Sequence, residues 1–395
     1  MTVTAFLDEL AWRGLLFQHT EGAAAALSTG PVTGYVGFDP TASSLHAGNL
    51  VAIMSLVHLQ RAGHRPMALV GGGTGMIGDP SGKATERQLL TTDMVDENIS
   101  GISAQLARVL DFDGPRGVMM RNNADWLRPL DLIGFLRDVG KYFTVNYMLQ
   151  KDSVDSRINS ETGISFTEFS YMLLQAYDFA ELYRRDGVTF QLGGSDQWGN
   201  ITAGTTLVRK MHGAEAHGVT LPLLTTSAGT KFGKSEAGAV WLDAARTSPY
   251  QFYQFWIGAD DRDAGRYLRT FTLLAREEIE ALDEATAAAP EKREAQRAPL
   301  CGAQRRTVRS CHVCAPPFVR CSTRTKSADH PRSRAHRGGP RIGGSCSALV
   351  EGEQVGFGLS ADQDADRSCR DGQDRGSRDV VVIAGHRLII SAGRL

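Results

Sequence analysis

Strand-like and helix-like segments alternate along the first part of the chain, and this alternation limits the folds that are open to it. The predicted strands are residues 31–38, 66–70, 188–192 and 221–224. A helical pattern over roughly residues 46–61 lies between the first two and stops at Gly63. Such alternation is typical of a parallel sheet with helices on its faces. We therefore predict an α/β, Rossmann-like domain whose ligands bind beyond the carboxyl ends of the strands.

A second composition begins near residue 298. The net charge of the whole chain is −1, yet residues 299–395 hold 15 Arg, one Lys and nine acidic residues. All six cysteines lie in this part, and it contains no Trp or Tyr. Its hydrophobic periodicity is lost as well. We therefore predict an irregular, disordered tail over residues 298–395.

The first residues of the chain do not read as a targeting signal. Residues 1–16 have the pattern of a short amphipathic helix, without the charged start and small-residue cleavage site of a secretion signal. No apolar run approaches the roughly 18 residues that a membrane span needs. We therefore expect a cytoplasmic protein with no membrane partner.

A glycine-rich loop follows the second predicted strand. Gly73, Gly75 and Gly78 match the spacing of the dinucleotide fingerprint, but no clear acidic residue lies about 20 positions later to hold a ribose. A nicotinamide or flavin oxidoreductase is therefore a weakly supported alternative. A P-loop is excluded, because Ile77 and Ala84 stand where that motif needs Gly and Ser or Thr.

Two short motifs carry a family resemblance. The tetrapeptide HAGN at residues 46–49 resembles the HIGH signature of class I aminoacyl-tRNA synthetases, and KFGKS at residues 231–235 resembles their KMSKS loop. Four further segments are similar to the family of bacterial tyrosyl-tRNA synthetases: residues 35–41, 78–83, 168–179 and 193–200. The resemblance as a whole runs from the N-terminus to about residue 297.

The resemblance implies a tyrosine–tRNA ligase activity. Such an enzyme activates L-tyrosine with ATP to tyrosyl-adenylate and pyrophosphate, and then transfers the tyrosyl group to the 3′-terminal adenosine of tRNA(Tyr). Mg²⁺ is expected to enter with ATP, and neither a tightly bound prosthetic group nor a resident metal is expected. The alternative that stays open is a truncated or frameshifted relative that activates tyrosine but charges tRNA poorly.

The activation step asks the protein for positioning and for stabilisation of negative charge on phosphoryl oxygens. We expect backbone N–H groups of the helix start at residues 46–48 to face that charge. By resemblance, the catalytic residues are Thr41, His46, Asn49, Lys83, Arg87, Lys231 and Lys234. By resemblance, ATP is bound by Gly37, Asp39, His46, Gly48, Asn49, Gly194, Asp196 and Lys234. Asn49 and Val36 stand where many relatives carry His and Cys, so altered ATP affinity is expected.

A helix predicted over residues 167–184 places three polar side chains on one face, at positions i, i+4 and i+7. A solvated stripe is the ordinary interpretation, but this stripe holds only one charge. By resemblance, the tyrosine site consists of Tyr35, Asp79, Tyr171, Gln175, Asp178 and Gln197. Asp178 and Tyr35 would both bond the phenolic hydroxyl, so an analogue without it would leave a buried carboxylate unpaired.

The resemblance also divides the chain into regions. Residues 1–230 form the catalytic domain, with an inserted region at about residues 125–161 that makes a homodimer interface. Residues 231–297 hold the KFGKS loop and a partial α-helical anticodon-binding domain. The tail, residues 298–395, takes the place of the S4-like RNA-binding domain that the family usually has. Three interpretations of it stay open: an Arg-rich arm on tRNA phosphates, a metal site at Cys311, His312, Cys314 and Cys321, or an altered reading frame.

Overall fold

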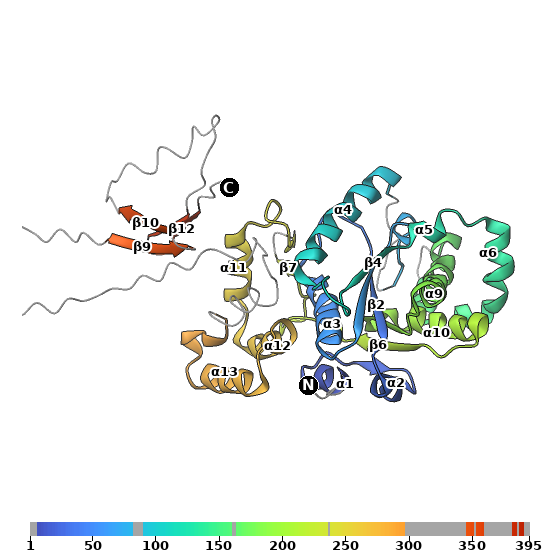
Figure 1. Cartoon of the computed structure of the whole chain (residues 1–395), viewed down its shortest axis with the longest axis horizontal. Helices are drawn as coiled ribbons and strands as arrows, with labels where there is room; N and C mark the ends of the chain where they lie inside the picture. Colours follow the sequence, from blue (N-terminus) through green and yellow to red (C-terminus); the bar gives the residue numbers. More distant parts are fainter. Residues whose placement is uncertain are drawn as a thin grey trace, which may run out of the picture. The chain divides into compact units, whose positions relative to one another are not determined.

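The structure is a computed structural model of the chain, shown in Figure 1. It describes residues 6–81, 90–159, 163–235 and 238–296, together with the backbone of four short strands between residues 345 and 390. The chain divides into two units, Met1–Cys314 and Ala315–Leu395, each described by itself.

A six-stranded sheet in the order β1-β6-β5-β2-β3-β4 forms the centre of the first unit. Five strands run parallel: β2 (Thr33–Phe38), β3 (Arg65–Val70), β4 (Met119–Asn122), β5 (Phe190–Gly194) and β6 (His217–Leu221). The edge strand β1 (Gln18–His19) pairs antiparallel with β6, so the predicted all-parallel sheet is corrected at this edge. The strand order reverses around β2, which opens a crevice at the carboxyl ends of β2 and β5.

Two strand predictions were shifted along the chain. The strand predicted at residues 188–192 begins at Phe190 and continues to Gly194. The strand predicted at residues 221–224 was wrong, because β6 ends at Leu221. Residue 222 is proline, which has no backbone N–H to donate to the sheet.

Helices cover both faces of the sheet. On one face lie α1 (Phe6–Trp12) and α3 (Leu50–Arg61), whose apolar side chains share a core with β2 and β5. On the other lie α9 (Phe166–Asp186) and α10 (Trp198–His212), which pack in a second core. Further helices are α2 (Ala23–Thr29) and α4 (Thr92–Val109). The predicted helices at 46–61 and 167–184 are confirmed, and α1 confirms residues 6–12 of the N-terminal one.

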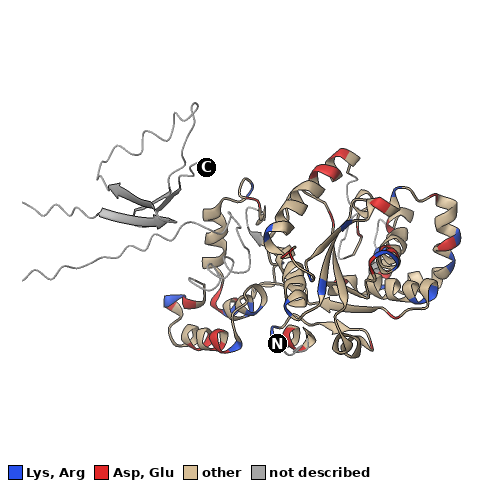
Figure 2. Cartoon of the chain, viewed as in Figure 1, with Lys and Arg blue, Asp and Glu red and all other residues tan. Residues whose placement is uncertain are grey.

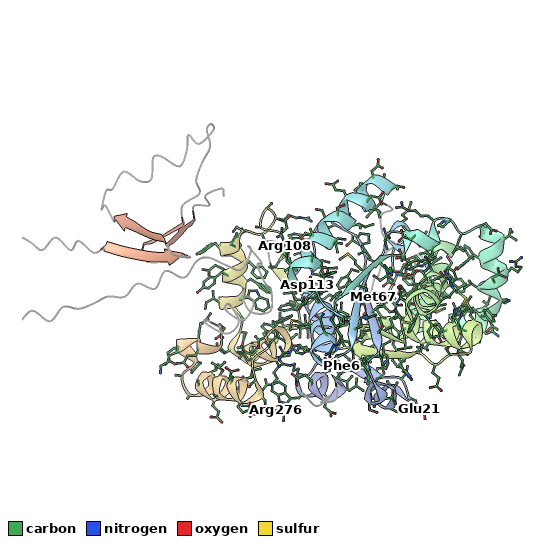
Figure 3. The ribbon with its side chains drawn as sticks, in the orientation of Figure 1. Phe6, Glu21, Met67, Arg108, Asp113 and Arg276 are labelled. Atoms are coloured by element: carbon green, nitrogen blue, oxygen red, sulfur yellow. The ribbon has the colours of Figure 1, made fainter. Side chains whose placement is uncertain are left out.

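Charged residues lie mainly on the outer helices, and the strands of the sheet are mostly buried. The strands of the sheet are mostly tan in Figure 2, and the acidic and basic residues lie mainly on the helices. In Figure 3, Met67 lies at the centre of the sheet, whereas Glu21 and Arg276 lie at the edge of the unit. Met67 is fully buried. Among the described residues, no helix is long and apolar enough to cross a membrane.

The inserted region is built from short helices. They are α5 (Ala124–Leu127), α6 (Leu132–Asp138), the 3-10 turn η3 (Gly140–Tyr142), α7 (Val145–Leu149) and α8 (Asp152–Ile158). Phe143 and Met148 are buried, in agreement with a packing role. Leu132 and Ile133, in contrast, are 67% and 71% exposed.

A helical region follows the KFGKS loop, as predicted for residues 241–294. It contains α11 (Pro249–Ile257), α12 (Asp261–Phe271), α13 (Arg276–Ala288) and the turn η5 (Pro290–Lys292). Arg13 ties it to the N-terminal segment, because its buried guanidinium donates to the carbonyls of Arg269, Thr272 and Leu274 at 2.8–3.0 Å. These carbonyls lie around the end of α12, where helix carbonyls lack internal partners.

The described part of the second unit consists of two hairpins. Strand β9 (Ser345–Val350) pairs with β10 (Glu353–Gly358), and β11 (Val381–Ala384) pairs with β12 (Arg387–Ile390). The sequence indicated strands near the second hairpin only, at residues 380–383 and 388–390. Apart from these strands, the tail predicted at residues 298–395 lies outside the described residues, and so do Cys311, His312, Cys314 and Cys321 of the predicted metal site.

Candidate functional site

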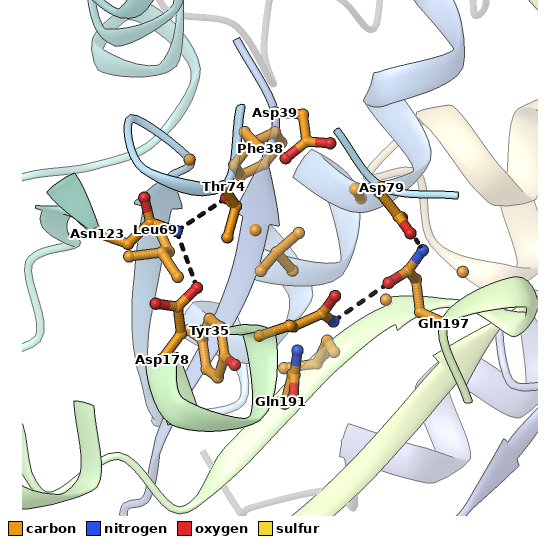
Figure 4. Close-up of a pocket in the computed structure, with 18 of the residues that line it drawn as sticks. Tyr35, Phe38, Asp39, Leu69, Thr74, Asp79, Asn123, Asp178, Gln191 and Gln197 are labelled. Carbon is orange, nitrogen blue, oxygen red and sulfur yellow. Dashed lines mark hydrogen bonds between the residues drawn. The ribbon is translucent and has the colours of Figure 1, made fainter. Parts of the chain in front are cut away.

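A cavity of about 210 Å³ opens at the carboxyl ends of β2 and β5 (Figure 4). Its size is below the roughly 300–1,000 Å³ of sites for drug-sized ligands, so it suits one small metabolite. The lining includes all six predicted residues of the tyrosine site and three of the eight predicted residues of the ATP site. They are Tyr35, Gly37, Asp39, Asp79, Tyr171, Gln175, Asp178, Gly194 and Gln197.

Asp178 is the most deeply buried carboxylate of this cavity. It lies on the inner face of α9 with 2% of its surface exposed. Trp126 donates to one carboxylate oxygen at 2.7 Å, and Asn123 donates to the other at 2.8 Å. Burial nevertheless raises the pKa of Asp178 from its ordinary 3.8 to about 7; the two donors oppose this rise and nearby Asp39 adds to it.

Tyr35 projects from β2 beside Asp178 (Figure 4). It is 1% exposed, and its phenolic oxygen has no hydrogen-bond partner within the part of the chain that the structure describes. Its ring packs edge-on against Phe179, with 5.4 Å between the ring centroids. A buried hydroxyl without a protein partner is costly. At the wall of a cavity, it indicates a ligand with a polar group at this point.

A chain of amide and carboxylate groups lines the other side of the cavity. Gln175 donates to Gln197 at 3.1 Å, and Gln197 donates to Asp79 at 2.6 Å. Asn200 donates to Gln175 at 3.1 Å. Tyr171, one turn before Gln175 on α9, is 4% exposed. The structure thus brings together predicted residues from three distant segments, and their oxygens can accept from an ammonium group.

The HAGN segment forms a 3-10 turn, η1 (Ala47–Asn49), before α3 begins at Leu50. The backbone N–H of Gly48 donates to Nδ1 of His46 at 3.0 Å, and that of His46 donates to Oδ1 of Asn49 at 2.9 Å. The N–H groups of Ala47 and Asn49 also have partners. The prediction of free backbone N–H groups at this helix start is therefore wrong for this structure.

Gly48 is required here by close packing. A Cβ atom at Gly48 would lie 2.8 Å from the ring of His46, and one at Gly233 would lie 2.6 Å from the Gly48 nitrogen. Gly233 also has a φ of +82°, which favours glycine. The two motifs are thus in direct contact, although Gly48 and Gly233 lie 185 residues apart in the sequence.

Backbone hydrogen bonds hold the two motifs together. Ala47 donates to the carbonyl of Val240 at 2.7 Å, and Val240 donates to that of Gly233 at 2.9 Å. Phe232 lies in an aromatic cluster of the helical region, 4.9 Å from Phe271 and 5.8 Å from Trp256 between centroids. The KFGKS loop is therefore anchored to the HAGN turn on one side and to α11 and α12 on the other.

The remaining predicted site residues lie outside the cavity lining or outside the described residues. Lys231 is exposed in its loop, and Lys234 lies in the short strand β7 (Lys234–Ser235). Thr41 and Asp196 are exposed and are not part of the cavity lining. Lys83 and Arg87 lie outside the described residues. The geometry therefore unites the predicted tyrosine residues more fully than the predicted cations.

Several residues of the site were missed by sequence reasoning. Asn123 and Trp126 follow β4, a strand of only four residues with no alternating pattern to reveal it. The sequence signal that could have indicated them is the pair Asn122–Asn123, which directly precedes the start of α5. Thr74, Gln191 and Asn200 are further members of the lining or of its hydrogen bonds.

The glycines of the dinucleotide-like fingerprint pack against the protein. A Cβ atom at Gly73 would lie 2.8 Å from Leu127, and one at Gly75 would lie 2.9 Å from Pro40. The loop continues into a single 3-10 turn, η2 (Thr74–Met76), rather than into a long helix. This arrangement does not match the fingerprint, in which a helix N-terminus faces the pyrophosphate.

The chain is similar to known proteins in sequence. The family model of tRNA synthetases class I (W and Y) matches residues 27–299. The chain is 60% identical over 291 residues to the tyrosine–tRNA ligase of Anaeromyxobacter dehalogenans strain 2CP-1, covering 74% of this chain and 69% of the relative. It is 59% identical over 295 residues to that of Roseiflexus castenholzii, covering 74% and 70%.

A solved structure is also similar. It is a C-terminally truncated mitochondrial tyrosyl-tRNA synthetase from Aspergillus nidulans, with a TM-score of 0.71 and 29% identity. The similarity covers 79% of this chain and 91% of that one. The likeness is therefore one of sequence and of fold.

The raised pKa of Asp178 predicts a pH-dependent stability. The folded protein binds the carboxyl proton of Asp178 more tightly than the unfolded chain does. The protonated carboxyl group therefore adds to the free energy of unfolding in full below about pH 4, and this stabilisation is lost as the pH rises through about 7. Each unit of pKa difference is worth about 1.4 kcal/mol. We expect the melting temperature of the native protein, relative to Asp178→Asn, to fall between pH 5 and pH 8. Exposed Asp113→Asn is the control, and a constant difference with pH would contradict the assignment.

Proposed function

The chain belongs to the class I tRNA synthetases for tryptophan and tyrosine, and from this premise we propose that it ligates tyrosine to its tRNA. Curated tyrosine–tRNA ligases at about 60% identity over 74% of the chain support tyrosine as the amino acid. The alternative of a relative that only activates tyrosine is not favoured by these similarities. The reaction uses ATP, tyrosine and tRNA as substrates.

The observation that carries the proposal is that the carboxylate of Asp178 and the hydroxyl of Tyr35, which has no partner among the described residues, line the same cavity. A tyrosine side chain placed there would donate its phenolic hydrogen to Asp178, and its oxygen would accept from the hydroxyl of Tyr35. Both groups are buried and polar. A phenylalanine ring would leave the Tyr35 hydroxyl without a partner and would give Asp178 no donor beyond Asn123 and Trp126, at a cost that increases with the charge of the group.

The opposite end of the cavity suits the amino-acid backbone. Asp79, Tyr171 and Gln175 would surround the α-ammonium group, and Gln197 would contact the carboxylate. The hydrogen bonds that link Gln175, Gln197 and Asp79 hold these side chains in place before the substrate binds. Such pre-organisation reduces the entropy lost on binding. The carboxylate is then directed toward the ATP side of the crevice.

For the activation step, the carboxylate oxygen attacks the α-phosphorus of ATP and pyrophosphate leaves. We assign the phosphate contacts to Thr41, His46, Lys231 and Lys234, and a second group of cations to Lys83 and Arg87. Asp196 would accept from a ribose hydroxyl. Mg²⁺ would enter with ATP and neutralise part of the phosphate charge. The contact between Gly48 and Gly233 supports the joint action of the two motifs.

The transfer step requires tRNA to reach the same crevice. We propose that residues 1–230 form the catalytic domain and residues 231–297 a partial anticodon-binding domain. Residues 298–395 stand in place of the S4-like domain. A cytoplasmic location fits the use of ATP and tRNA.

We further propose a homodimer formed through the inserted region. Several apolar side chains of this segment are exposed: Leu132, Ile133, Leu136, Val145, Leu149 and Ile158 are each 39–71% exposed, and Phe166 at the start of α9 is 76% exposed. Large exposed apolar surfaces are uncommon on monomers and mark contact sites. A two-fold axis would bury the same surface of both subunits.

Two assays on the full chain test the proposed function. Tyrosine-dependent exchange of pyrophosphate into ATP measures activation, and charging of tRNA(Tyr) measures transfer. We expect both activities in the native protein. Asp178→Ala should abolish the exchange, because the phenol loses its acceptor, while exposed Glu280→Ala on α13 should not. Undiminished exchange in Asp178→Ala would contradict the pocket assignment, and exchange without charging would select the truncated alternative.

The homodimer predicts a change of mass in solution. Ile133→Glu places a charge in the apolar surface and should convert dimer to monomer in sedimentation equilibrium at micromolar concentration. Phe17→Glu, at a side chain that is 59% exposed outside this surface, is the matched control and should stay dimeric. A native protein that sediments as a monomer would refute the proposal.

A further inference from the structure

The loop between β2 and the HAGN turn has no helix or strand over residues 40–45. It carries Thr41 and ends at His46, two of the residues to which we assign phosphate contacts. Backbone groups of an irregular segment cannot satisfy each other as those of a helix do, so they need partners elsewhere. The position of the two phosphate contacts therefore depends on what holds this loop.

Helix α4 provides polar side chains at both ends of the loop. Asn98 donates to the carbonyl of Pro40 at 2.8 Å in a buried contact. The backbone N–H of Leu45 donates to Oε1 of Gln105 at 2.8 Å, and Nε2 of Gln105 donates to Oγ of Ser44 at 2.9 Å. These partners lie 58–61 residues apart in the sequence.

A third contact lies between them. Gly101 touches the loop so closely that a Cβ atom there would lie 2.1 Å from the carbonyl oxygen of Ser43. Asn98, Gly101 and Gln105 are spaced as i, i+3 and i+7, which places them on one face of α4. On the same helix, Ile102 and Leu106 are fully buried in the hydrophobic core. The helix that bears the three contacts is therefore fixed to the rest of the unit.

The far side of the loop is held by the chain that follows the KFGKS motif. Leu242 donates to the carbonyl of Leu45 at 2.8 Å, beside the bond between Ala47 and Val240. The segment before His46 thus lies between α4 and residues 240–242. None of Asn98, Gly101 and Gln105 lines the cavity that holds Asp178.

We propose that Asn98, Gly101 and Gln105 of α4 are positioning residues for ATP, which act by holding the loop at residues 40–45 so that Thr41 and His46 meet the phosphates. The inference rests on the proposed function and extends it to residues that do not touch the substrate. Displacement of a catalytic group by about 1 Å can cost on the order of a hundredfold in rate. Tyrosine binding, which uses α9 and β2, does not depend on this loop.

Two variants test the role. Asn98→Asp keeps the size of the side chain but replaces the donor to Pro40 by a carboxylate oxygen, and Gln105→Leu removes both bonds of Gln105. Glu97→Gln, an exposed carboxylate-to-amide change on the same helix, is the control. The measurements are kcat and KM for ATP in tyrosine-dependent pyrophosphate exchange, and the Kd of tyrosine by equilibrium dialysis without ATP, all on the full chain.

We expect kcat/KM for ATP to fall about tenfold or more in both variants, in line with the loss of a buried hydrogen bond. The Kd of tyrosine should stay within about twofold of the native value, and the control should match the native protein. If Asn98→Asp does not fold, Gln105→Leu decides alone, because Gln105 is only partly buried.

Two results would overturn the positioning role. One is an unchanged kcat/KM for ATP in a variant that binds tyrosine normally. The other is a parallel loss of tyrosine affinity and ATP use, which would show a general contribution to folding. A native chain without any exchange activity would instead refute the proposed function, so the two failures are distinguished by the native protein.

Discussion

The buried carboxylate of Asp178 is the constraint on which the candidate site depends. A charge removed from water is costly unless it is paired, and here the cost is visible in a pKa raised to about 7. Asn123 and Trp126, from the end of β4 and from α5, offset part of it. Helix α9 is thereby tied to the edge of the sheet, and the cavity keeps one strong acceptor for a ligand that can donate to it.

The second tie joins the two signature motifs. Close contact between Gly48 and Gly233, with the backbone bonds through Val240, connects the catalytic domain that we propose to the loop that follows it in the sequence. Phe232 extends this link into the aromatic cluster of α11 and α12. The side of the crevice that we assign to the phosphates is therefore held by backbone contacts, whereas the side that we assign to the amino acid is formed by side chains, among them those of Tyr35, Gln175 and Asp178. A side-chain substitution therefore removes a contact directly on the amino-acid side, whereas on the other side it acts through the backbone.

The sequence predicts the alternating α/β architecture and the helix at residues 167–184 because long periodic segments show their period directly. It also predicts that Tyr171, Gln175 and Asp178 share a face. It does not predict β4 or its neighbours Asn123 and Trp126, because four residues carry no period. The end of β6 was misplaced although Pro222 marks it. One hydrogen bond of the HAGN turn, from Ala47 to Val240, joins residues almost 200 positions apart and cannot be revealed by local sequence.

The central claim is that the cavity selects an aromatic amino acid by its hydroxyl group. The most direct test is kcat/KM for activation of tyrosine, phenylalanine and tryptophan by the full chain in pyrophosphate exchange. Phenylalanine would lose the hydrogen bonds to Asp178 and Tyr35 at a cost of about 3 kcal/mol, so tyrosine should exceed phenylalanine by roughly a hundredfold or more. Tryptophan, which can donate but is larger, should also be rejected. Activation of either competitor within about tenfold of tyrosine would contradict the account.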